Sequence, residues 1–352
     1  YVRRIMKKER LVYLDILKII AMIMVIHIHI VSPMWWHNDI YSVSFAWANF
    51  FEGISRWAVP IFVMSTGALL LNPEISLPAN KLIKKIMRMV ITLLVFGTLY
   101  SIGFRLINNE IFNLTLIINA LKDIYLVKAA NHLWFIYMLI GLYLIAPILK
   151  TYIKNASKKN IEYFLILWAI FSLIIPMIIN LGLKSAIPLV NELRLTMVLY
   201  YPGYLVLGHY LNYYTVKENH RIIAYVLGVI GLYITIFMTY DHITNIGRTS
   251  QLYFGYNTLN VALTAIGLFL FSKYNLNKIK TGKKIITLLS TYTFSIFLVH
   301  GFLVYMIPRL YDLSFLYEHL YLTPIIALIV YLISFIIVYI LAKIPYLKKL
   351  LI

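Results

Sequence analysis

The stretch Leu11-Val-Tyr-Leu-Asp-Ile-Leu-Lys-Ile-Ile-Ala-Met-Ile-Met-Val-Ile-His-Ile-His-Ile-Val31 decides the fold class of this chain. Apart from a few titratable side chains it is apolar over about twenty residues, the length that crosses a hydrocarbon core as an α-helix. Backbone polar groups in lipid must be paired within their own segment, so a helix is the expected conformation. Further apolar runs of the same kind follow along the chain. We therefore expect an all-α protein, a polytopic transmembrane bundle of about ten helices.

The composition agrees with a single membrane domain. The 352 residues are 62% hydrophobic and 13% charged, whereas soluble domains carry roughly 25% charged residues. The connections are too short to hold a soluble domain, so we expect one domain over 1–352, with 1–10 as a basic leader. Cysteine is absent, which excludes a disulfide framework and a thiolate nucleophile. The expected spans are 11–31, 47–71, 87–107, 132–149, 161–180, 197–213, 222–240, 256–272, 286–307 and 323–342.

The distribution of positive charge predicts the orientation. With the amino terminus inside, 23 of the 32 Lys and Arg residues lie in cytoplasmic segments and 7 in outer ones. The positive-inside rule then places both termini in the cytoplasm. The net charge of +19 is spread over short loops facing anionic lipid, so we expect the lipid bilayer, and no nucleic acid, as a partner. In the longest connection, 105–131, a weakly amphipathic stretch at 111–127 should lie along the outer surface or dip back into the membrane.

The first span carries four titratable residues, which are costly in lipid and are functional candidates by default. Around a helix, Lys18 and His29 lie about 20° apart and Asp15 about 60° from Lys18, whereas His27 faces the opposite side. Asp15 and Lys18 can form a simple i,i+3 ion pair, and His29 can be an ordinary interfacial histidine. A neutral imidazole is also the most versatile proton acceptor near neutral pH. The face shared by Asp15, Lys18 and His29 is therefore the first candidate site.

The second span holds Glu52 and Arg56 at i,i+4, so one charge can neutralise the other. An arginine this deep in the membrane is still costly, which makes Arg56 a functional candidate. Ser65 and Gly67 lie in a proline-kinked stretch rich in small residues. Small residues let transmembrane helices approach closely, so we expect packing roles for these two.

A basic cluster precedes the third span, at Lys84, Lys85 and Arg88. Such a cluster can anchor the topology. It can equally form a cradle for a phosphate-bearing ligand, since fixed cations suit phosphates. The sequence leaves both alternatives open.

Two further histidines are candidate site residues. His132 lies at the start of the fourth span and is followed by Trp134, and His300 lies in the ninth span. Either can be an interfacial residue with an ordinary hydrogen bond, and aromatic residues at the interface are common. His209 in the sixth span is the weaker candidate and is expected to be structural. No pair of histidines shows ligand spacing on a common face, so no metal is expected.

Several of these residues resemble the motifs of a known family. Leu14-Asp-Ile-Leu-Lys18, ten residues and His29 resemble the Arg/Lys-x10-His motif of the acyltransferase 3 family of membrane O-acyltransferases. Ser55-Arg-Trp-Ala-Val-Pro-Ile-Phe62, closing with Ser65 and Gly67, is similar to the second-helix pattern of that family. Lys85-x-x-Arg88 resembles its cytoplasmic Arg-x-x-Arg motif. Lysine replaces arginine at positions 18 and 85, which keeps the charge but loses the planar fork.

Later blocks extend the resemblance. His132-Leu-Trp-Phe135, followed by Leu142-Tyr-Leu-Ile-Ala-Pro147, looks like the fourth-helix block of stand-alone bacterial members. Those members include the enterobacterial common antigen O-acetyltransferase and the protein that modifies staphylococcal poly-N-acetylglucosamine. Ser290-Thr-Tyr292 through His300 is similar to a late-helix block ending in histidine. Five blocks in the same order and spacing indicate membership more strongly than any one of them.

The resemblance implies a function. It implies transfer of an acyl group, usually acetyl from acetyl-CoA, to a hydroxyl of a cell-envelope glycan, in the bacterial cytoplasmic (inner) membrane. The donor would be acetyl-CoA or another acyl-CoA, with no metal. The implied catalytic residues are His29, Lys18, Asp15 and Arg56. The implied cofactor-binding residues are Lys84, Lys85 and Arg88. The implied substrate-binding residues are His132, Trp134, Glu52 and His300.

A transporter is the alternative. A series of charges inside the membrane suits a pathway for a polysaccharide or a small solute as well as a catalytic site. The pair Lys85 and Arg88 and the histidine on the first span favour the enzyme, because export of a neutral glycan needs neither. In the enzyme, either a pantetheine arm reaches deep into a central cavity or an acyl intermediate moves between sites. The sequence does not choose between these routes.

Overall fold

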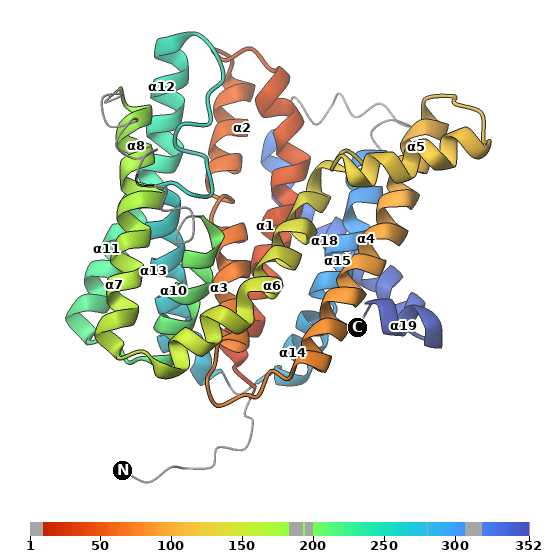
Figure 1. The fold of residues 1–352 in the computed structure, drawn as a ribbon. Helices are drawn as coiled ribbons and strands as arrows, with labels where there is room; N and C mark the ends of the chain where they lie inside the picture. The colour runs from red at the N-terminus through yellow and green to blue at the C-terminus, as the bar shows by residue number, and fades with distance from the viewer. Residues whose placement is uncertain (1–9, 183–192, 194–199, 280, 307–318, 352) are drawn as a thin grey trace.

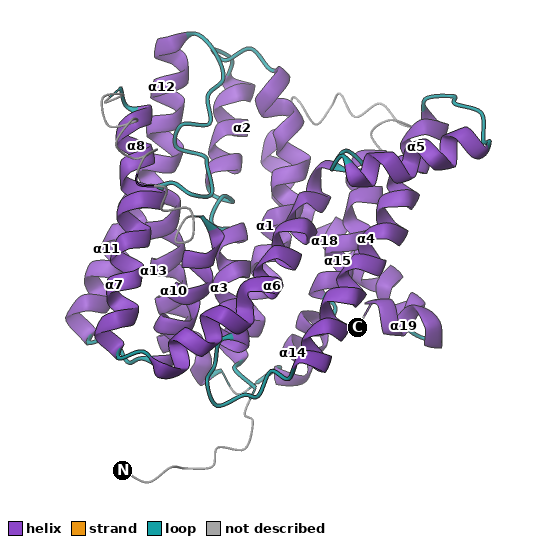
Figure 2. Cartoon of the chain, viewed as in Figure 1, coloured by secondary structure: helices purple, strands orange, loops and turns teal. Residues whose placement is uncertain are grey.

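The computed structural model describes residues 10–182, 193, 200–279, 281–306 and 319–351. Within them the chain forms helices and loops without strands (Figure 2), as expected. The first half contains α1 (Val12–His37), α2 (Val43–Gly53), α3 (Ala58–Leu70), α4 (Ala79–Ile107), α5 (Leu114–Tyr125), a 3-10 turn (Asn131–Leu133), α6 (Trp134–Asn155), α7 (Lys158–Trp168) and α8 (Ile175–Asn180).

The second half contains α10 (Tyr201–Tyr213), α11 (Glu218–Tyr233), α12 (Thr239–Ile246), α13 (Leu259–Asn275), α14 (Lys283–Thr291), α15 (Thr293–Gly301), α18 (Thr323–Leu341) and α19 (Pro345–Leu351). Short π-helical stretches at Ala169–Ile174 and Ile234–Met238 join α7 to α8 and α11 to α12. Each joined pair is therefore one continuous crossing.

The number of crossings in the described residues is slightly smaller than expected. Eight helices of the described residues are long and apolar enough to span a membrane, and the number is nine if the α14–α15 pair, bent by 51°, is counted as one broken span. The sixth expected span, 197–213, is the exception, because α10 has only 13 residues and part of the span lies outside the described residues. The all-α membrane bundle is confirmed, whereas α10 alone is too short for a full crossing at ~1.5 Å per residue.

The second expected span is broken in the middle. α2 ends at Gly53, and α3 begins at Ala58 after a turn formed by residues 54–57. Pro60 lies in the first turn of α3, where a missing N–H costs nothing because that group has no intrahelical partner. The proline therefore marks a restart of the helix rather than a kink within it.

Glycines bring two helix pairs into close contact. A Cβ on Gly67 of α3 would lie 1.8 Å from the Leu205 carbonyl oxygen of α10, and one on Gly208 would lie 2.0 Å from the Met64 oxygen. Gly228 and Gly267 meet in the same way between α11 and α13. The packing role expected for Gly67 is confirmed, since only small residues allow backbones to approach this closely.

The connections alternate between the two ends of the bundle. Those after α3, α6 and α10 lie at one end, and those after α1 and α12 lie at the other (Figure 1). This grouping agrees with the alternation assumed in the charge count, while the side that faces the cytoplasm stays a prediction. The amphipathic stretch is α5, which extends across the far end of α4 (Figure 1), as expected of a surface helix.

Candidate active site

A cavity of about 310 Å³ lies inside the bundle between α1, α3, α4, α6 and the α14–α15 pair. Its walls are mainly apolar, with residues such as Val25, Phe62, Leu139 and Phe297. Polar side chains gather at two places along it. We call them the basic end (Lys18, Lys85, Arg88, Ser290 and Thr291) and the histidine end (His29, His132, Trp134 and Tyr256).

The basic end contains three of the cations singled out in the sequence. Lys18 comes from the first turns of α1, and Lys85 and Arg88 come from one face of α4. Lys85 lies over the ring of Tyr143, with the ammonium 5.9 Å from the centroid. Arg88 donates to the carbonyl oxygens of Leu350 and Leu351 at the end of α19. A fixed set of cations beside a cavity is suited to a phosphate-bearing ligand.

Lys84 is not part of this end. It is exposed on α4 and does not line the cavity, although it neighbours Lys85 in the sequence. One residue along a helix turns a side chain by about 100°, which carries Lys84 off the cavity face.

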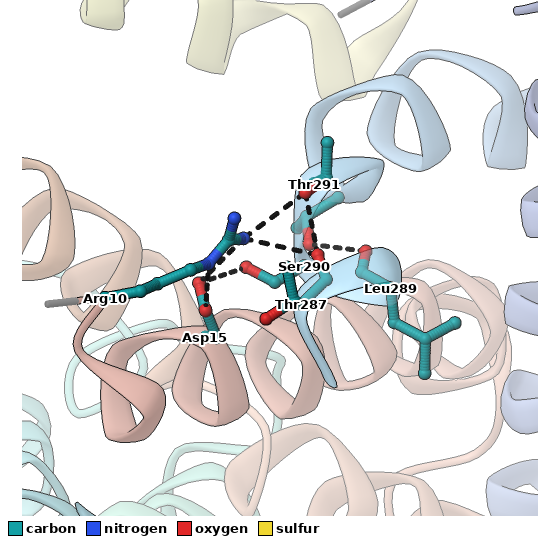
Figure 3. Close-up of polar contacts among 7 residues, drawn as sticks. Arg10, Asp15, Thr287, Leu289, Ser290 and Thr291 are labelled. Atoms are coloured by element: carbon teal, nitrogen blue, oxygen red, sulfur yellow. Dashed lines mark hydrogen bonds and ion pairs between the residues drawn. The ribbon is translucent and has the colours of Figure 1, made fainter. Parts of the chain in front are cut away.

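Asp15 lies next to the basic end, with a partner that the sequence did not indicate. Its carboxylate accepts hydrogen bonds from Arg10 and from Ser290, the latter at 2.6 Å (Figure 3). Arg10 also donates to the Thr287 carbonyl oxygen and to Thr291. We call these residues the α1–α14 clamp. The i,i+3 ion pair considered for Asp15 and Lys18 is therefore not the contact formed. Asp15 fixes the cavity wall instead of lining it.

The histidine end collects three imidazoles from separate helices. His29 of α1 stacks on His300 of α15, with ring centroids 5.5 Å apart, and lies 6.0 Å from His132, which precedes α6. The Nδ1 of His29 is hydrogen-bonded to the hydroxyl of Tyr305 at 2.8 Å. His29 and His132 line the cavity, whereas His300 is fully buried behind them. We call these three residues the histidine cluster.

Trp134 and Tyr256 form the aromatic part of the same end. Their rings are stacked with centroids 5.8 Å apart, and both line the cavity. Behind Tyr256, the guanidinium of Arg56 lies 5.7 Å from its ring centroid and 4.8 Å from that of Phe254.

Arg56 is paired with Glu52, as the i,i+4 spacing predicts. Both side chains are buried and neither lines the cavity. A buried ion pair with flanking aromatic rings can hold a charge in the membrane, which accounts for this arginine without a catalytic role. The structure places the pair behind Tyr256 at the histidine end, and the catalytic role implied for Arg56 and the substrate-binding role implied for Glu52 stay predictions.

The remaining histidines of the first and sixth spans do not line the cavity. His27, expected to face away, is bonded through both ring nitrogens, to Ser55 at 3.0 Å and to Thr323 at 3.1 Å. His209 is buried and stacks on Tyr213. In the part of the chain that the structure describes, no three His, Asp or Glu side chains are placed so that they could hold a metal ion.

A family model described as an acyltransferase domain matches residues 11–343. The chain belongs to the acyltransferase 3 family. Together with the apolar helices, this match makes the protein a multi-pass membrane acyltransferase. No curated protein and no solved structure is significantly similar to the chain.

In this acyltransferase the sequence identified every lysine, arginine and histidine that lines the cavity, but not the hydroxyl-bearing residues of the lining. Six of the predicted site residues line the cavity: Lys18, His29, Lys85, Arg88, His132 and Trp134. Five lie outside it: Asp15, Glu52, Arg56, Lys84 and His300. Tyr305 and Tyr256 were missed. Tyr305 follows His300 by five residues, but among 29 tyrosines neither of the two carries a local signal.

Proposed function

We propose that this membrane acyltransferase transfers an acyl group, acetyl in the simplest case, from acyl-CoA to a hydroxyl of a cell-envelope glycan. One observation carries the proposal: a single cavity joins the cations of the basic end to His29 at the histidine end. Lys18 and His29 are ~16 Å apart along the axis of α1. Because one cavity covers this distance, we favour the route in which a pantetheine arm reaches into the cavity. The other route, in which an acyl intermediate moves between two sites, is not needed.

The residues of the cavity suit each part of such a donor. Lys85 and Arg88, and Lys18 farther in, would face the phosphates of CoA, and the apolar middle of the cavity would hold the pantetheine chain. His29 would act as the general base. In the tautomer whose Nδ1–H donates to the Tyr305 oxygen, its Nε2 keeps a lone pair for the acceptor hydroxyl. The aromatic pair Trp134 and Tyr256 would form the surface on which the acceptor lies.

The test is release of CoA and transfer of label by the purified protein supplied with radiolabelled acetyl-CoA. General-base catalysis contributes about 10²–10⁴ in rate, so His29→Ala should lower turnover by at least about 100-fold. His37→Ala is the matched control, because His37 is an exposed histidine of the same helix. Full turnover in His29→Ala would remove the base assignment. Uptake of a solute or export of a glycan by proteoliposomes without any acyl donor would favour a transporter.

A neighbouring pair of lysines tests the donor site. Lys85→Ala should raise the KM for acetyl-CoA, because Lys85 lines the basic end. Lys84→Ala should leave KM unchanged, because Lys84 is exposed and off the cavity. Equal effects of the two substitutions would show that only general surface charge attracts the donor.

A further inference from the structure

Arg88 of the basic end is held by the last turn of α19. Its Nε donates to the Leu350 carbonyl oxygen at 3.2 Å, and its Nη2 donates to the Leu351 carbonyl oxygen at 3.1 Å. Both carbonyls belong to the turn in which a helix leaves its C=O groups without intrahelical partners. A guanidinium that binds two successive oxygens through its planar fork is fixed in orientation as well as in position.

The same two oxygens also accept hydrogen bonds from hydroxyl groups of α4 and α15. Ser295 of α15 donates to the Leu351 oxygen at 2.6 Å. Thr92, one turn after Arg88 on α4, donates to the Leu350 oxygen at 3.5 Å. α19, which lies beside α4 (Figure 1), is thereby joined to two helices that border the cavity.

The bond of Ser295 differs from those of other buried hydroxyl groups in the bundle. Thr235 and Thr239 each donate to the carbonyl oxygen four residues earlier in the chain. Such a bond satisfies a hydroxyl group without help from another segment. Ser295 is fully buried, yet it donates to a residue 56 positions later. Its hydroxyl group therefore connects α15 to α19.

Apolar contacts hold α19 in the same place. Leu351 is only 2% exposed and belongs to the hydrophobic core, against which Leu347 and Leu350 also pack. Tyr346, by contrast, is 84% exposed. Because one face of α19 is buried, its carbonyl oxygens are fixed independently of Arg88, and they can serve as a support for the arginine.

From these contacts we infer that α19 is a positioning element of the donor site, which holds the Arg88 guanidinium in place for the phosphates of acyl-CoA. The inference rests on the proposed function. Arg88 lines the cavity, whereas Ser295 and Leu351 do not, so α19 acts on the donor through Arg88. An arginine that is already ordered loses less side-chain entropy when it binds a phosphate. α19 therefore raises the affinity for the donor without touching it.

The test measures KM for acetyl-CoA and kcat from the release of CoA by the purified protein. Ser295→Ala removes the hydrogen bond to α19, and Leu351→Ala removes most of its buried anchor. Each should raise KM by about two- to tenfold, the effect of one side chain that must be ordered on binding. The kcat at saturating acetyl-CoA should not change, because the lost interaction concerns binding of the donor and not the transition state alone.

Two controls match these substitutions. Ser334→Ala removes a fully buried hydroxyl group of α18 that has no hydrogen-bond partner among the described residues. Tyr346→Ala removes an exposed side chain of α19 itself. Both variants should keep the KM and the kcat of the wild type.

Combination with Arg88→Ala separates positioning from a general loss of structure. In the Arg88→Ala background, Ser295→Ala should add nothing to KM, because its effect passes through Arg88. Lys85 lies over the ring of Tyr143 of α6. In the Lys85→Ala background, Ser295→Ala should therefore keep its full effect.

Each result decides the inference. An unchanged or lower KM in Ser295→Ala would overturn it, and so would an equal rise of KM with and without Arg88. Thermal unfolding shows which variants are folded, and if one of the Ser295 and Leu351 variants is not, the other decides. Wild-type KM in Arg88→Ala would remove Arg88 from the donor site and overturn the inference with it. Failure of the wild-type protein to release CoA from acetyl-CoA would instead overturn the proposed function.

Discussion

The two faces of α3 are packed in opposite ways. One face, with Gly67, lies against α10 so closely that even a methyl group would collide with the backbone. The other face, with Val59, Phe62 and Thr66, borders the cavity. The same helix therefore serves a dry, close-packed sector and a hollow one. Within lipid no hydrophobic effect drives the helices together, so close van der Waals contacts such as that between α3 and α10 hold the bundle together instead. The sector around the cavity can therefore stay hollow.

The largest expected effect comes from the close-packed face. Gly67→Ala places a Cβ 1.8 Å from the Leu205 oxygen, so α3 and α10 must separate. Overpacking of this kind costs about 1–3 kcal/mol and more where backbone blocks relaxation. Thermal unfolding in detergent should show a clear fall in Tm.

Gly141→Ala in α6 is the control for the same chemical change. A Cβ there meets nothing within 4 Å, so the substitution should be neutral or stabilise the helix by about 0.5–1 kcal/mol. An equal Tm for the two variants would mean that α3 and α10 do not depend on glycine for their contact.

A substitution at the neighbouring position 66 should leave the stability unchanged and lower the activity instead. Because Thr66 lines the cavity, Thr66→Phe should fill part of it while the α3–α10 contact at Gly67 stays as it is. Folding should survive, and CoA release should fall by about tenfold or more, which corresponds to ~1.4 kcal/mol in the barrier. Leu69→Phe is the control, because Leu69 is 42% exposed on the same helix and lies off the cavity. Normal turnover in Thr66→Phe would show that the cavity is not the route of the substrate.

The α1–α14 clamp should have a smaller effect, at the basic end of the hollow sector. Asp15→Asn keeps an acceptor for Ser290 but removes the charge that Arg10 pairs with, at a cost on the order of 1 kcal/mol, because Arg10 is half exposed. The difference in Tm between wild type and variant should shrink as salt is added, since exposed pairs are screened. A difference that is the same at low and high salt would indicate a role for Asp15 other than pairing with Arg10.

The smallest expected effect lies outside both sectors, where α5 joins α4. Burial would raise the pKa of the Asp123 carboxyl, but hydrogen bonds from Ser101 and Arg105 and the charge of Arg105 together lower it. A lowered pKa in the folded state means that the stabilisation is present above the unfolded value of about 3.9 and is lost as the pH falls through the folded value. The Tm of the wild type should thus drop more than that of Asp123→Asn on acidification. Parallel curves would show that this contact contributes nothing.

Helical periodicity alone predicts much of the site. The spacing of eleven residues places Lys18 and His29 on one face, and both line the cavity. The i,i+4 spacing predicts the Glu52–Arg56 pair. These predictions hold because they depend only on the geometry of a single helix. In lipid the backbone N–H and C=O groups have no water to bind, so they must pair within the segment and the helix is the only conformation available to it.

Contacts between helices could not be predicted in the same way. Asp15 has a charged neighbour on its own helix, yet its partners are Arg10, which precedes that helix, and Ser290, 275 residues away. His29, His132 and His300 were three separate candidates with no indication that they meet. The sequence by itself determined the membrane class, the helices and the titratable residues that face inward. Only the tertiary structure decided which of those residues share a cavity, because the side of a helix that meets a given neighbour depends on how all the helices pack together.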